Sequence, residues 1–305
     1  MNIVFMGTPD FAVPSLEKLA QHHNIMAVFT QPDKPVGRKM ILTPPDVKVC
    51  AEKLNIPVYQ PEKLRIGDSF DIISKMNPDV IVVVAYGQIL PENILNIPKY
   101  GCINVHGSLL PKYRGAAPIQ WAVLNGDKKT GVTTMYMEKG LDTGDILLVD
   151  EYEIDINDTA GDVFDKLAVM GGNLILKTLD LAEKEGLTPI KQDDTQSSYA
   201  KMLDKSLCNI DFNKLASEVH NQVRGLSPWP VATTSYNGKV LKIFETRLTK
   251  GNGKPGEIIS TNPLTVACGE DAVIVNTLQL QGKKKMDSKA FLQGHKLEIG
   301  TIIGE

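Results

Sequence analysis

The sequence has few of the features that mark secreted, membrane or metal-binding proteins. Its 305 residues include only 4 cysteines, which lie far apart and form no C-x-x-C pair. The 5 histidines do not stand at metal-ligand spacing from them. The longest purely apolar run, residues 80–85, is far shorter than the roughly 20 residues that span a bilayer. The first residues do not resemble a signal peptide. We therefore expect a cytoplasmic protein with reduced thiols, no metal and no membrane partner.

No strong charge of one sign covers the whole chain. The sequence has 33 Lys and Arg against 36 Asp and Glu, a net charge of -3, so no global positive field indicates a nucleic-acid partner. The charge is unevenly distributed, because residues 206–305 hold 12 Lys and Arg but only 9 Asp and Glu. A mildly basic tail behind an acidic body fits a polyanion that contacts one part of the chain.

The first two-thirds of the chain alternates short β-rich runs with helical patterns. Residues 80–85 are apolar at every position, which is typical of a strand covered on both faces, as in parallel sheets. Strands separated by helices predict a doubly wound α/β domain. The expected strands are residues 2–6, 25–30, 80–85, 102–106, 132–137 and 146–154. The expected helices are residues 11–21, 47–54 and 116–124, followed by a long helix with Thr159 and Asp162 at capping-box spacing.

After residue 228 the pattern changes to short β-rich runs separated by Asn-Gly and Gly-Asn-Gly turns. Five or so short strands within about 80 residues predict a small barrel of the OB type. The unpatterned residues 187–209 are expected to connect this part to the first. The predicted domains are therefore residues 1–186 and 210–305, with 187–209 as a linker. Residues 211–224 look helical, and the polar stretch 33–43 is expected to be a loop.

A common nucleotide-binding motif is absent at the end of the first strand. That strand ends in Gly7-Thr8-Pro9-Asp10, where a dinucleotide-binding protein would carry G-x-G-x-x-G. Pro9 also removes a backbone N–H that a pyrophosphate would accept from. This argues against a nicotinamide cofactor, although a helix N-terminus at this place still suits an anion or polar ligand.

The densest group of chemically active residues is the run C-I-N-V-H-G-S-L-L-P-K-Y-R at residues 102–114. A strand places Asn104 and His106 on the same face. They stand at its carboxyl end, where ligands bind in open α/β sheets. A lone histidine here is more often structural. An amide donor beside a titratable imidazole, however, suits a developing oxyanion.

A second segment, residues 140–145, places Asp142 in a turn between two β-rich runs. Its two glycines allow the backbone to bring a carboxylate close to another segment. Asp and Gly are also the usual residues of a simple hairpin turn. From this segment alone, the plain turn is the favoured interpretation.

Four motifs taken together resemble the methionyl-tRNA formyltransferase family. They are M-G-T-P-D-F, Q-P-D-K-P-x-G-R, N-V-H-G-S-L-L-P-x-Y-R-G-A-A-P-I and G-L-D-T-G-D-I, in that order within the first half of the chain. S-P-W-P at residues 227–230 and G-K-K-K at 282–285 resemble the family's C-terminal domain. The H-G-S-L-L-P and L-D-T-G-D motifs belong to the wider group of 10-formyltetrahydrofolate-using enzymes. The arginine-bearing loop and the C-terminal half indicate the tRNA-directed member.

The resemblance implies an α/β Rossmann-like formyltransferase domain followed by a small OB-like β-barrel domain. It implies transfer of a formyl group from 10-formyltetrahydrofolate to the α-amino group of methionyl initiator tRNA, for translation initiation. The implied catalytic residues are Asn104, His106 and Asp142, and no metal is required. The implied folate contacts are Ser108, Leu109, Leu110 and Pro111. Resemblance and local charge together predict contacts to tRNA or its methionyl group by Arg38, Phe11, Lys39, Lys283, Lys284 and Lys285. The expected partners are initiator methionyl-tRNA and tetrahydrofolate, and the chain is expected to be a monomer.

Several other functions stay open from the residues alone. A glycinamide-ribonucleotide formyltransferase would use the same three residues but gives no reason for the β-rich tail. A formyltetrahydrofolate hydrolase or dehydrogenase would pass the formyl group to water or oxidise it. A formyltransferase acting on a nucleotide sugar or another small amine would differ mainly in its acceptor. An OB-fold RNA-binding protein on an α/β scaffold would leave Asn104, His106 and Asp142 unexplained.

Overall fold

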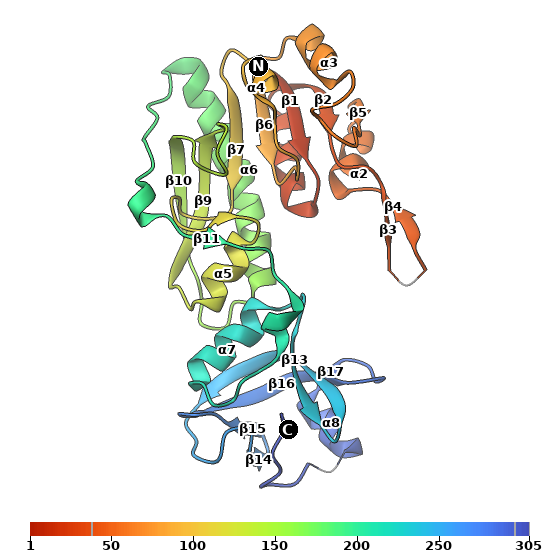
Figure 1. Cartoon of the computed structure of the whole chain (residues 1–305), viewed down its shortest axis with the longest axis vertical. Coiled ribbons are helices and arrows are strands. Elements are labelled where there is room, and N and C mark those ends of the chain that lie inside the picture. Colours follow the sequence, from red (N-terminus) through yellow and green to blue (C-terminus); the bar gives the residue numbers. More distant parts are fainter. Residues whose placement is uncertain (38, 296, 305) are drawn as a thin grey trace. The chain divides into compact units, whose positions relative to one another are not determined.

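The computed structural model describes residues 1–37, 39–295 and 297–304 (Figure 1). Contacts within the chain divide it into two compact units. The first unit comprises Met1–Gly115, Thr130–Tyr152 and Phe164–Tyr199, and the second comprises Ala116–Lys129, Glu153–Val163 and Ala200–Glu305. The segment 187–209 is therefore shared, because residues 187–199 pack with the first unit and residues 200–209 with the second.

The first unit is built on a seven-stranded sheet in the order β10-β9-β7-β6-β1-β2-β5. These strands are β1 (Asn2–Gly7), β2 (Asn24–Phe29), β5 (Val58–Tyr59), β6 (Val80–Val84), β7 (Cys102–His106), β9 (Lys129–Tyr136) and β10 (Ile146–Glu153). The five strands from β7 to β5 pair in parallel, whereas β9 runs antiparallel to β7. The expected Rossmann-like sheet is confirmed. It is mixed rather than wholly parallel.

Helices cover both faces of this sheet. The helices of the unit are η1 (Asp10–Ala12), α1 (Val13–Ala20), α2 (Asp46–Lys53), α3 (Ser69–Met76), α4 (Glu92–Leu95) and the long α6 (Ala160–Lys184). A Cβ on Gly171 of α6 would lie 3.0 Å from Val105 of β7, so the missing side chain lets the helix approach the sheet. On the opposite face, Ile73 of α3 and Ile94 of α4 share a buried cluster with Cys102. The expected capping box is confirmed, since the Thr159 and Asp162 backbone N–H groups each donate to the other's side chain.

Alternation along β7 decides which face its polar side chains take. Val105 packs against α6, whereas Cys102 lies in the cluster under α3 and α4. Because side chains alternate along a strand, Asn104 and His106 share the face of Cys102. All five residues of β7 are buried, since the strand lies inside the sheet with both faces covered.

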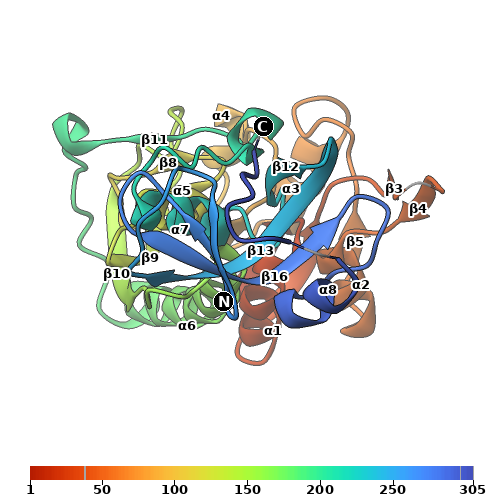
Figure 2. The ribbon, with the colours of Figure 1, turned by 90° about the horizontal axis from the view of Figure 1, so that it is seen from below.

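The stretch 33–43, which was expected to be a loop, is a β-hairpin. β3 (Lys34–Val36) pairs antiparallel with β4 (Ile41–Thr43), and every residue of both strands is exposed. Its base is anchored at Asp33, whose carboxylate accepts hydrogen bonds from Lys48 Nζ at 2.9 Å and Gln60 Nε2 at 2.7 Å. Figures 1 and 2 show the hairpin projecting from the first unit. The expectation of a loop was wrong because Pro and Gly dominate the local pattern and each strand is only three residues long.

The second unit carries an antiparallel sheet in the order β12-β13-β16-β15-β14, with β17 paired to β16. Its strands are β12 (Ala232–Tyr236), β13 (Lys239–Thr249), β14 (Ile258–Thr261), β15 (Leu264–Ala267), β16 (Ala272–Leu280) and β17 (Met286–Asp287). α7 (Ala216–Gly225) packs against β13 and β16, and α8 (Ser288–Gly294) packs against β16 and β17 (Figure 2). The expected small β-rich domain is confirmed, and its helix begins later than residue 211.

The remaining short elements are α5 (Pro118–Leu124), β8 (Arg114–Gly115), β11 (Tyr199–Ala200), η2 (Asp194–Gln196) and η3 (Lys205–Cys208). Among the described residues, no helix has the length and apolar character needed to cross a bilayer. All four cysteines are free thiols in buried positions. The described residues contain no group of three or more His, Cys, Asp or Glu that would hold a metal ion.

A buried histidine joins α7 to the rest of the second unit. His220 is 1% exposed. Its Nε2 donates to the carbonyl oxygen of Ile156 at 2.7 Å, and its Nδ1 accepts from the Thr246 hydroxyl at 2.9 Å. Burial lowers the pKa of His220 below the usual 6.5, the bond to Ile156 opposes this, and the nearby Arg224 guanidinium adds to the lowering. The lowered pKa therefore favours the neutral ring, with Nε2–H donating to Ile156 and Nδ1 accepting from Thr246.

We expect the second unit to lose stability as the pH falls below about 6.5. There His220 binds a proton in the unfolded chain, whereas its lowered pKa keeps it neutral in the folded protein. One such group contributes at most about 1.4 kcal/mol per pH unit. His220→Gln keeps a donor for Ile156 and removes the titration, so its stability should depend less steeply on pH. Urea unfolding followed by the fluorescence of Trp121 and Trp229, both in the second unit, measures this. Equal slopes in the two proteins would contradict the assignment.

Candidate active site

Two polar side chains stand at the carboxyl end of β7. Asn104 and His106 are 8% and 6% exposed. Their backbones are fixed, because Asn104 pairs with Val83 of β6 and with Met135 of β9, and His106 pairs with Thr133 of β9. Within the described part of the chain, the Asn104 side-chain amide has no hydrogen-bond partner. Its oxygen and nitrogen are not among the fully buried unpartnered polar atoms, so the amide is accessible and available for a ligand.

The ring of His106 is oriented by a backbone carbonyl. Its Nε2 donates to the carbonyl oxygen of Tyr113 at 2.8 Å, which leaves Nδ1 facing Asp142 Oδ2 at 3.8 Å. That separation exceeds a hydrogen bond. The carboxylate therefore faces the ring as a nearby negative charge without a direct hydrogen bond to it.

Asp142 reaches this place from the turn between β9 and β10. Its backbone has a left-handed φ of 53°, unusual for a residue other than glycine. Its carboxylate accepts a hydrogen bond from the backbone N–H of Gly115 at 2.8 Å. A Cβ on Gly144 would lie 1.8 Å from the carbonyl oxygen of Tyr136, so only glycine fits there. The structure thus brings Asp142 to His106, as the motif resemblance predicted and local sequence did not.

The predicted folate tetrapeptide follows β7 directly. The Ser108 hydroxyl is fully buried and donates to the carbonyl oxygen of Lys112 at 2.7 Å, which closes a tight loop. The Thr133 hydroxyl, at 2.6 Å from the Ser108 carbonyl oxygen, ties the loop to β9. Leu110 is buried, whereas Leu109 and Pro111 are half-buried. The loop is rigid and offers apolar surface at these two positions.

The other predicted contact residues belong to other elements of the chain. Phe11 follows β1 and packs at a tilt against Phe164 of α6, with ring centroids 5.1 Å apart. Lys39 is exposed in the β3–β4 hairpin, and Arg38 lies outside the described residues. Lys283, Lys284 and Lys285 are exposed on the turn between β16 and β17 of the second unit.

Sequence reasoning missed two residues that hold the site together. Gln192 donates from Nε2 to the carbonyl oxygens of Asp142 at 2.8 Å and Gly144 at 2.7 Å. Arg114 donates from Nη2 to Gln192 Oε1 at 2.8 Å. Arg114 is the last residue of the motif at residues 102–114, which the sequence already indicated as part of the site. Gln192 lies in a polar stretch without any local signal.

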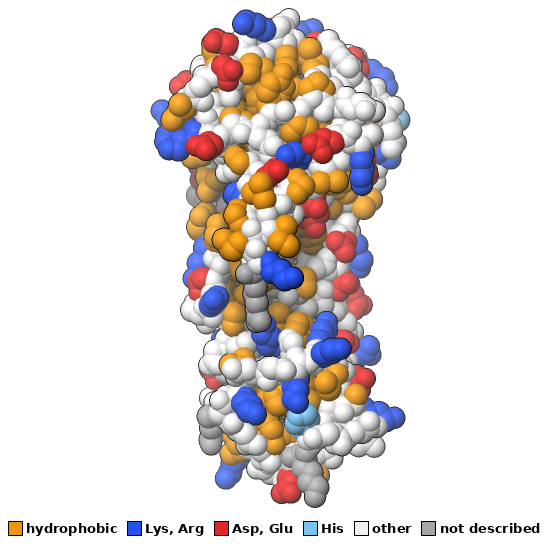
Figure 3. All heavy atoms as spheres, turned by 90° about the vertical axis from the view of Figure 1, so that its right-hand side faces the viewer, with side chains coloured by type: hydrophobic (Ala, Val, Ile, Leu, Met, Phe, Trp, Pro, Cys, Tyr) orange, Lys and Arg blue, Asp and Glu red, His pale blue; other side chains and the backbone are white. Residues whose placement is uncertain are grey.

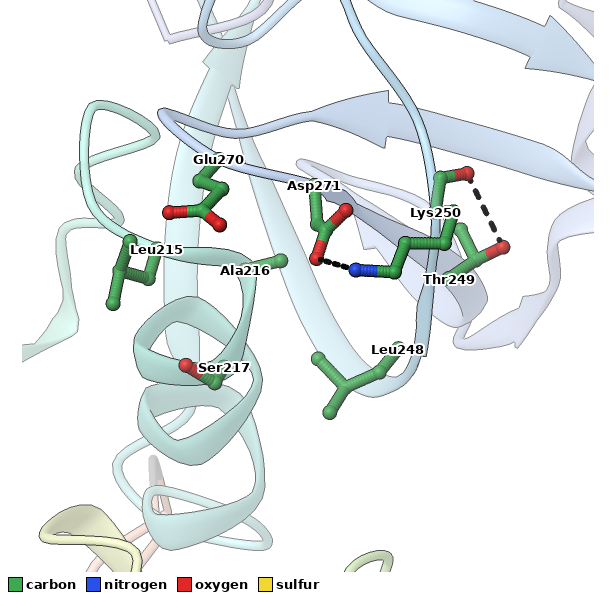
Figure 4. A pocket seen from close by; sticks show the side chains of 8 residues that line it. All are labelled: Leu215, Ala216, Ser217, Leu248, Thr249, Lys250, Glu270 and Asp271. Atoms are coloured by element: carbon green, nitrogen blue, oxygen red, sulfur yellow. Dashed lines mark hydrogen bonds and ion pairs between the residues drawn. The ribbon is translucent and has the colours of Figure 1, made fainter.

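Two other features do not belong to this chemistry. Burial raises the pKa of the Cys102 thiol to about 12, so it is no nucleophile although it shares β7. A hollow of about 420 Å³ opens in the second unit (Figure 4). Its lining includes an ion pair of 2.8 Å between Lys250 and Asp271 but none of the predicted site residues.

Comparison with known families matches almost the whole chain. Residues 1–179 match the family described as formyl transferase, and residues 202–296 match the formyl transferase C-terminal domain. The first match contains Asn104, His106 and Asp142, together with the loops that hold them.

Individual relatives agree over the full length. The chain is 50% identical over 315 residues to the methionyl-tRNA formyltransferase of Lachnospira eligens, covering all of both chains. It is 49% identical over 308 residues to that of Clostridium novyi, covering 99% of this chain and 100% of the relative. The solved structure of WlaRD, a sugar 3N-formyl transferase with dTDP and 5-N-formyl-THF, has a TM-score of 0.67. At 22% identity, over 93% of this chain and 99% of that one, it supports the fold alone.

Proposed function

Because the chain belongs to the formyl transferase family, we propose that it transfers the formyl group of 10-formyltetrahydrofolate to the α-amino group of methionyl initiator tRNA. Relatives about half identical over the whole chain carry the name methionyl-tRNA formyltransferase, which supports this acceptor. The observation that carries the chemistry is the cluster at the carboxyl end of β7. It combines the open amide of Asn104, the imidazole of His106 and the carboxylate of Asp142.

In the proposed reaction, the methionyl nitrogen forms a bond to the formyl carbon and the carbonyl electron pair moves to oxygen. Asn104 donates to that negative oxygen, and protonated His106 donates a second hydrogen bond. Asp142 keeps His106 charged and accepts the proton that leaves the attacking amine, through a water. The electron pair on oxygen then re-forms the carbonyl, the bond to N10 of the folate breaks, and N10 takes up the proton that Asp142 accepted, again through the water. At 3.8 Å, His106 Nδ1 and Asp142 Oδ2 are close enough for both to reach one reacting group that lies beside them.

We assign the folate contacts to the loop that follows His106. Leu109 and Pro111 are the half-buried members of the tetrapeptide and present apolar surface to the donor. Ser108 and Leu110 are buried, so we propose that they shape the loop and leave its backbone to bind polar folate groups. A rigid loop suits this role because no ordering cost is added on binding.

We propose that tRNA contacts the β3–β4 hairpin and the basic turn of the second unit. The hairpin presents Lys34 and Lys39 for phosphates, and Arg38 belongs to the same predicted contact. Its exposed apolar residues are Val36, Met40, Ile41 and Leu42. Figure 3 faces this hairpin and shows hydrophobic side chains beside Lys and Arg side chains on the first unit. Lys283, Lys284 and Lys285 supply the contact from residues 210–305.

Phe11 is proposed to line the pocket for the methionyl side chain, from its place at the end of β1. We further propose that the protein works as a monomer in the cytoplasm, where translation begins. No symmetric partner is needed, because Asn104, His106 and Asp142 all come from one chain.

The acceptor decides between this proposal and its alternatives. With 10-formyltetrahydrofolate as donor, we expect formyl-methionyl-tRNA to form at least about 100-fold more efficiently than formylated amino-sugar nucleotide or glycinamide ribonucleotide, judged by kcat/KM. Radiolabelled formyl transfer to each acceptor measures this. Uncharged initiator tRNA is the matched control because it has the same polyanion but no amine. Faster formylation of the sugar nucleotide would overturn the proposal.

A further inference from the structure

The segment after α6 carries Gln192, whose side chain bonds both to the turn that holds Asp142 and to the loop that orients His106. Gln192 is half-buried and belongs to the first unit. Two residues before it, Ile190 is joined to Ile146 of β10 by two backbone hydrogen bonds, each 2.8 Å long. The amide nitrogen of Gln192 donates to the carbonyl oxygens of Asp142 and Gly144. One side chain thus holds both ends of the short turn that presents the Asp142 carboxylate.

The other end of the same amide reaches the loop that holds His106. Gln192 Oε1 accepts from Arg114 Nε at 3.1 Å and Arg114 Nη2 at 2.8 Å. Arg114 stands between Tyr113, whose carbonyl oxygen orients His106, and Gly115, whose N–H binds the Asp142 carboxylate. The orientation of the amide is unambiguous chemically, because carbonyl oxygens only accept and a guanidinium only donates.

The same segment is tied to that loop by its backbone and by a hydroxyl. The Arg114 N–H donates to the carbonyl oxygen of Ser198, and the Tyr113 N–H donates to the Ser198 hydroxyl, both at 2.9 Å. These bonds fix the backbone after Gln192, and the Ile146–Ile190 pair fixes it before Gln192. The backbone that carries the Gln192 side chain is therefore anchored on both sides.

The turn needs such support because its backbone is unfavourable. Asp142 has a φ of 53°, a conformation that costs a non-glycine residue of order 1 kcal/mol or more unless the surroundings hold it. Gln192 bonds to the carbonyl of that same residue. Without the two amide donors the turn can relax, and the Asp142 carboxylate would move relative to His106.

We propose that Gln192 is a positioning residue that ties the Asp142 turn to the His106 loop and so sets the spacing of the two catalytic side chains. This inference rests on the proposed function, since it concerns the same site. Among the described residues, the Gln192 side chain bonds to Arg114, Asp142 and Gly144 and has no hydrogen bond to His106. It acts through Asp142, and its effect must therefore disappear when the Asp142 carboxylate is absent.

Gln192→Glu tests the two amide donors at nearly constant shape. It keeps an acceptor for Arg114 and sets a carboxylate oxygen against two carbonyl oxygens. We expect kcat for formyl transfer to fall about 10- to 100-fold, since a displacement of about 1 Å has effects of this size. The KM values for both substrates should change little. Gln196→Glu, in the same segment, is the charge-matched control, because among the described residues its side chain bonds to the exposed Asp193 alone. Asp194→Asn removes the exposed ion-pair partner of Arg114 and leaves Gln192 in place.

A double-mutant cycle separates positioning from general destabilisation. In the Asp142→Asn background, Gln192→Glu should lower kcat by less than about threefold, because the carboxylate to be positioned is gone. The pH profile gives a second readout. Where Asp142 has moved from His106, the alkaline limb of kcat should shift down by about half a pH unit or more. Equal losses in both backgrounds, or an unchanged pH profile, would overturn the inference.

Failure of the inference is distinguishable from failure of the proposed function. Hydrolysis of 10-formyltetrahydrofolate, measured in parallel, needs no tRNA and, on the proposed mechanism, uses the same His106–Asp142 pair. If the wild-type protein does not formylate charged initiator tRNA, the proposed acceptor is wrong, and the hydrolysis cycle alone decides the role of Gln192. Wild-type rates of both reactions in Gln192→Glu would overturn the inference while leaving the acceptor intact.

Discussion

Replacing Asp142 by Asn is expected to lower the turnover of formyl transfer about 100-fold or more, because both the charged state of His106 and the path of the amine proton depend on the carboxylate. An asparagine keeps the shape and can still accept the bond from the Gly115 N–H, which is 2.8 Å long in the wild-type site. Folate and tRNA binding should change far less. Single-turnover formylation of charged initiator tRNA, together with equilibrium binding of tetrahydrofolate, measures both quantities.

Asp150→Asn is the matched control for this prediction. Asp150 is an exposed carboxylate of β10 in the same unit, and its substitution makes the same change of charge. It should leave turnover unaltered. Near-normal turnover in Asp142→Asn would return Asp142 to the plain turn-forming role that local sequence favours. A large loss in the control would mean that net charge, rather than the His106 contact, governs the rate.

Replacing Asn104 by Ala is expected to lower kcat by about 100- to 1000-fold, the usual effect of removing one oxyanion donor. Its effect on stability should be small. The amide is accessible and has no hydrogen-bond partner among the described residues, so removing it breaks no hydrogen bond within that part of the chain. We expect a nearly unchanged melting temperature. Thermal unfolding and formyl-transfer kinetics on the same preparation test the two effects together.

Asn96→Ala provides the control, since Asn96 is an exposed residue just after α4 in the same unit. It should change neither turnover nor melting temperature appreciably. A melting temperature that drops in Asn104→Ala would show that the amide serves the fold, and the loss of activity would then have a structural cause. Activity retained with Asn104→Ala would remove it from the reaction altogether.

Local sequence accounts for most elements of both units. The all-apolar run at residues 80–85 identified β6 because a strand inside a covered sheet has no polar face. The capping-box pair Thr159 and Asp162 located the start of α6, since both hydrogen bonds lie within one helical turn. The β3–β4 hairpin escaped detection because its strands are exposed on all sides and leave no hydrophobic alternation.

The catalytic group required both kinds of information. Asn104 and His106 stand two residues apart on one strand, so their common face follows from the sequence alone. Asp142 lies 27 residues from Gly115, which binds its carboxylate, and only the turn between β9 and β10 brings it there. The resemblance of the motifs assigned Asp142 to the same site as His106, whereas hydrophobic periodicity contains no information about that contact.

Sequence by itself therefore determined the alternation of strands and helices, the β-rich tail and the identity of the residues in the motifs. Only the tertiary structure decided the antiparallel edge of the sheet, the hairpin and the support of the active site. Gln192 shows the reason most clearly. Its partners lie 50 and 78 residues away along the chain. Hydrogen bonds of that span leave no periodic trace in the sequence, because each depends on where the folded backbone places a single donor and acceptor.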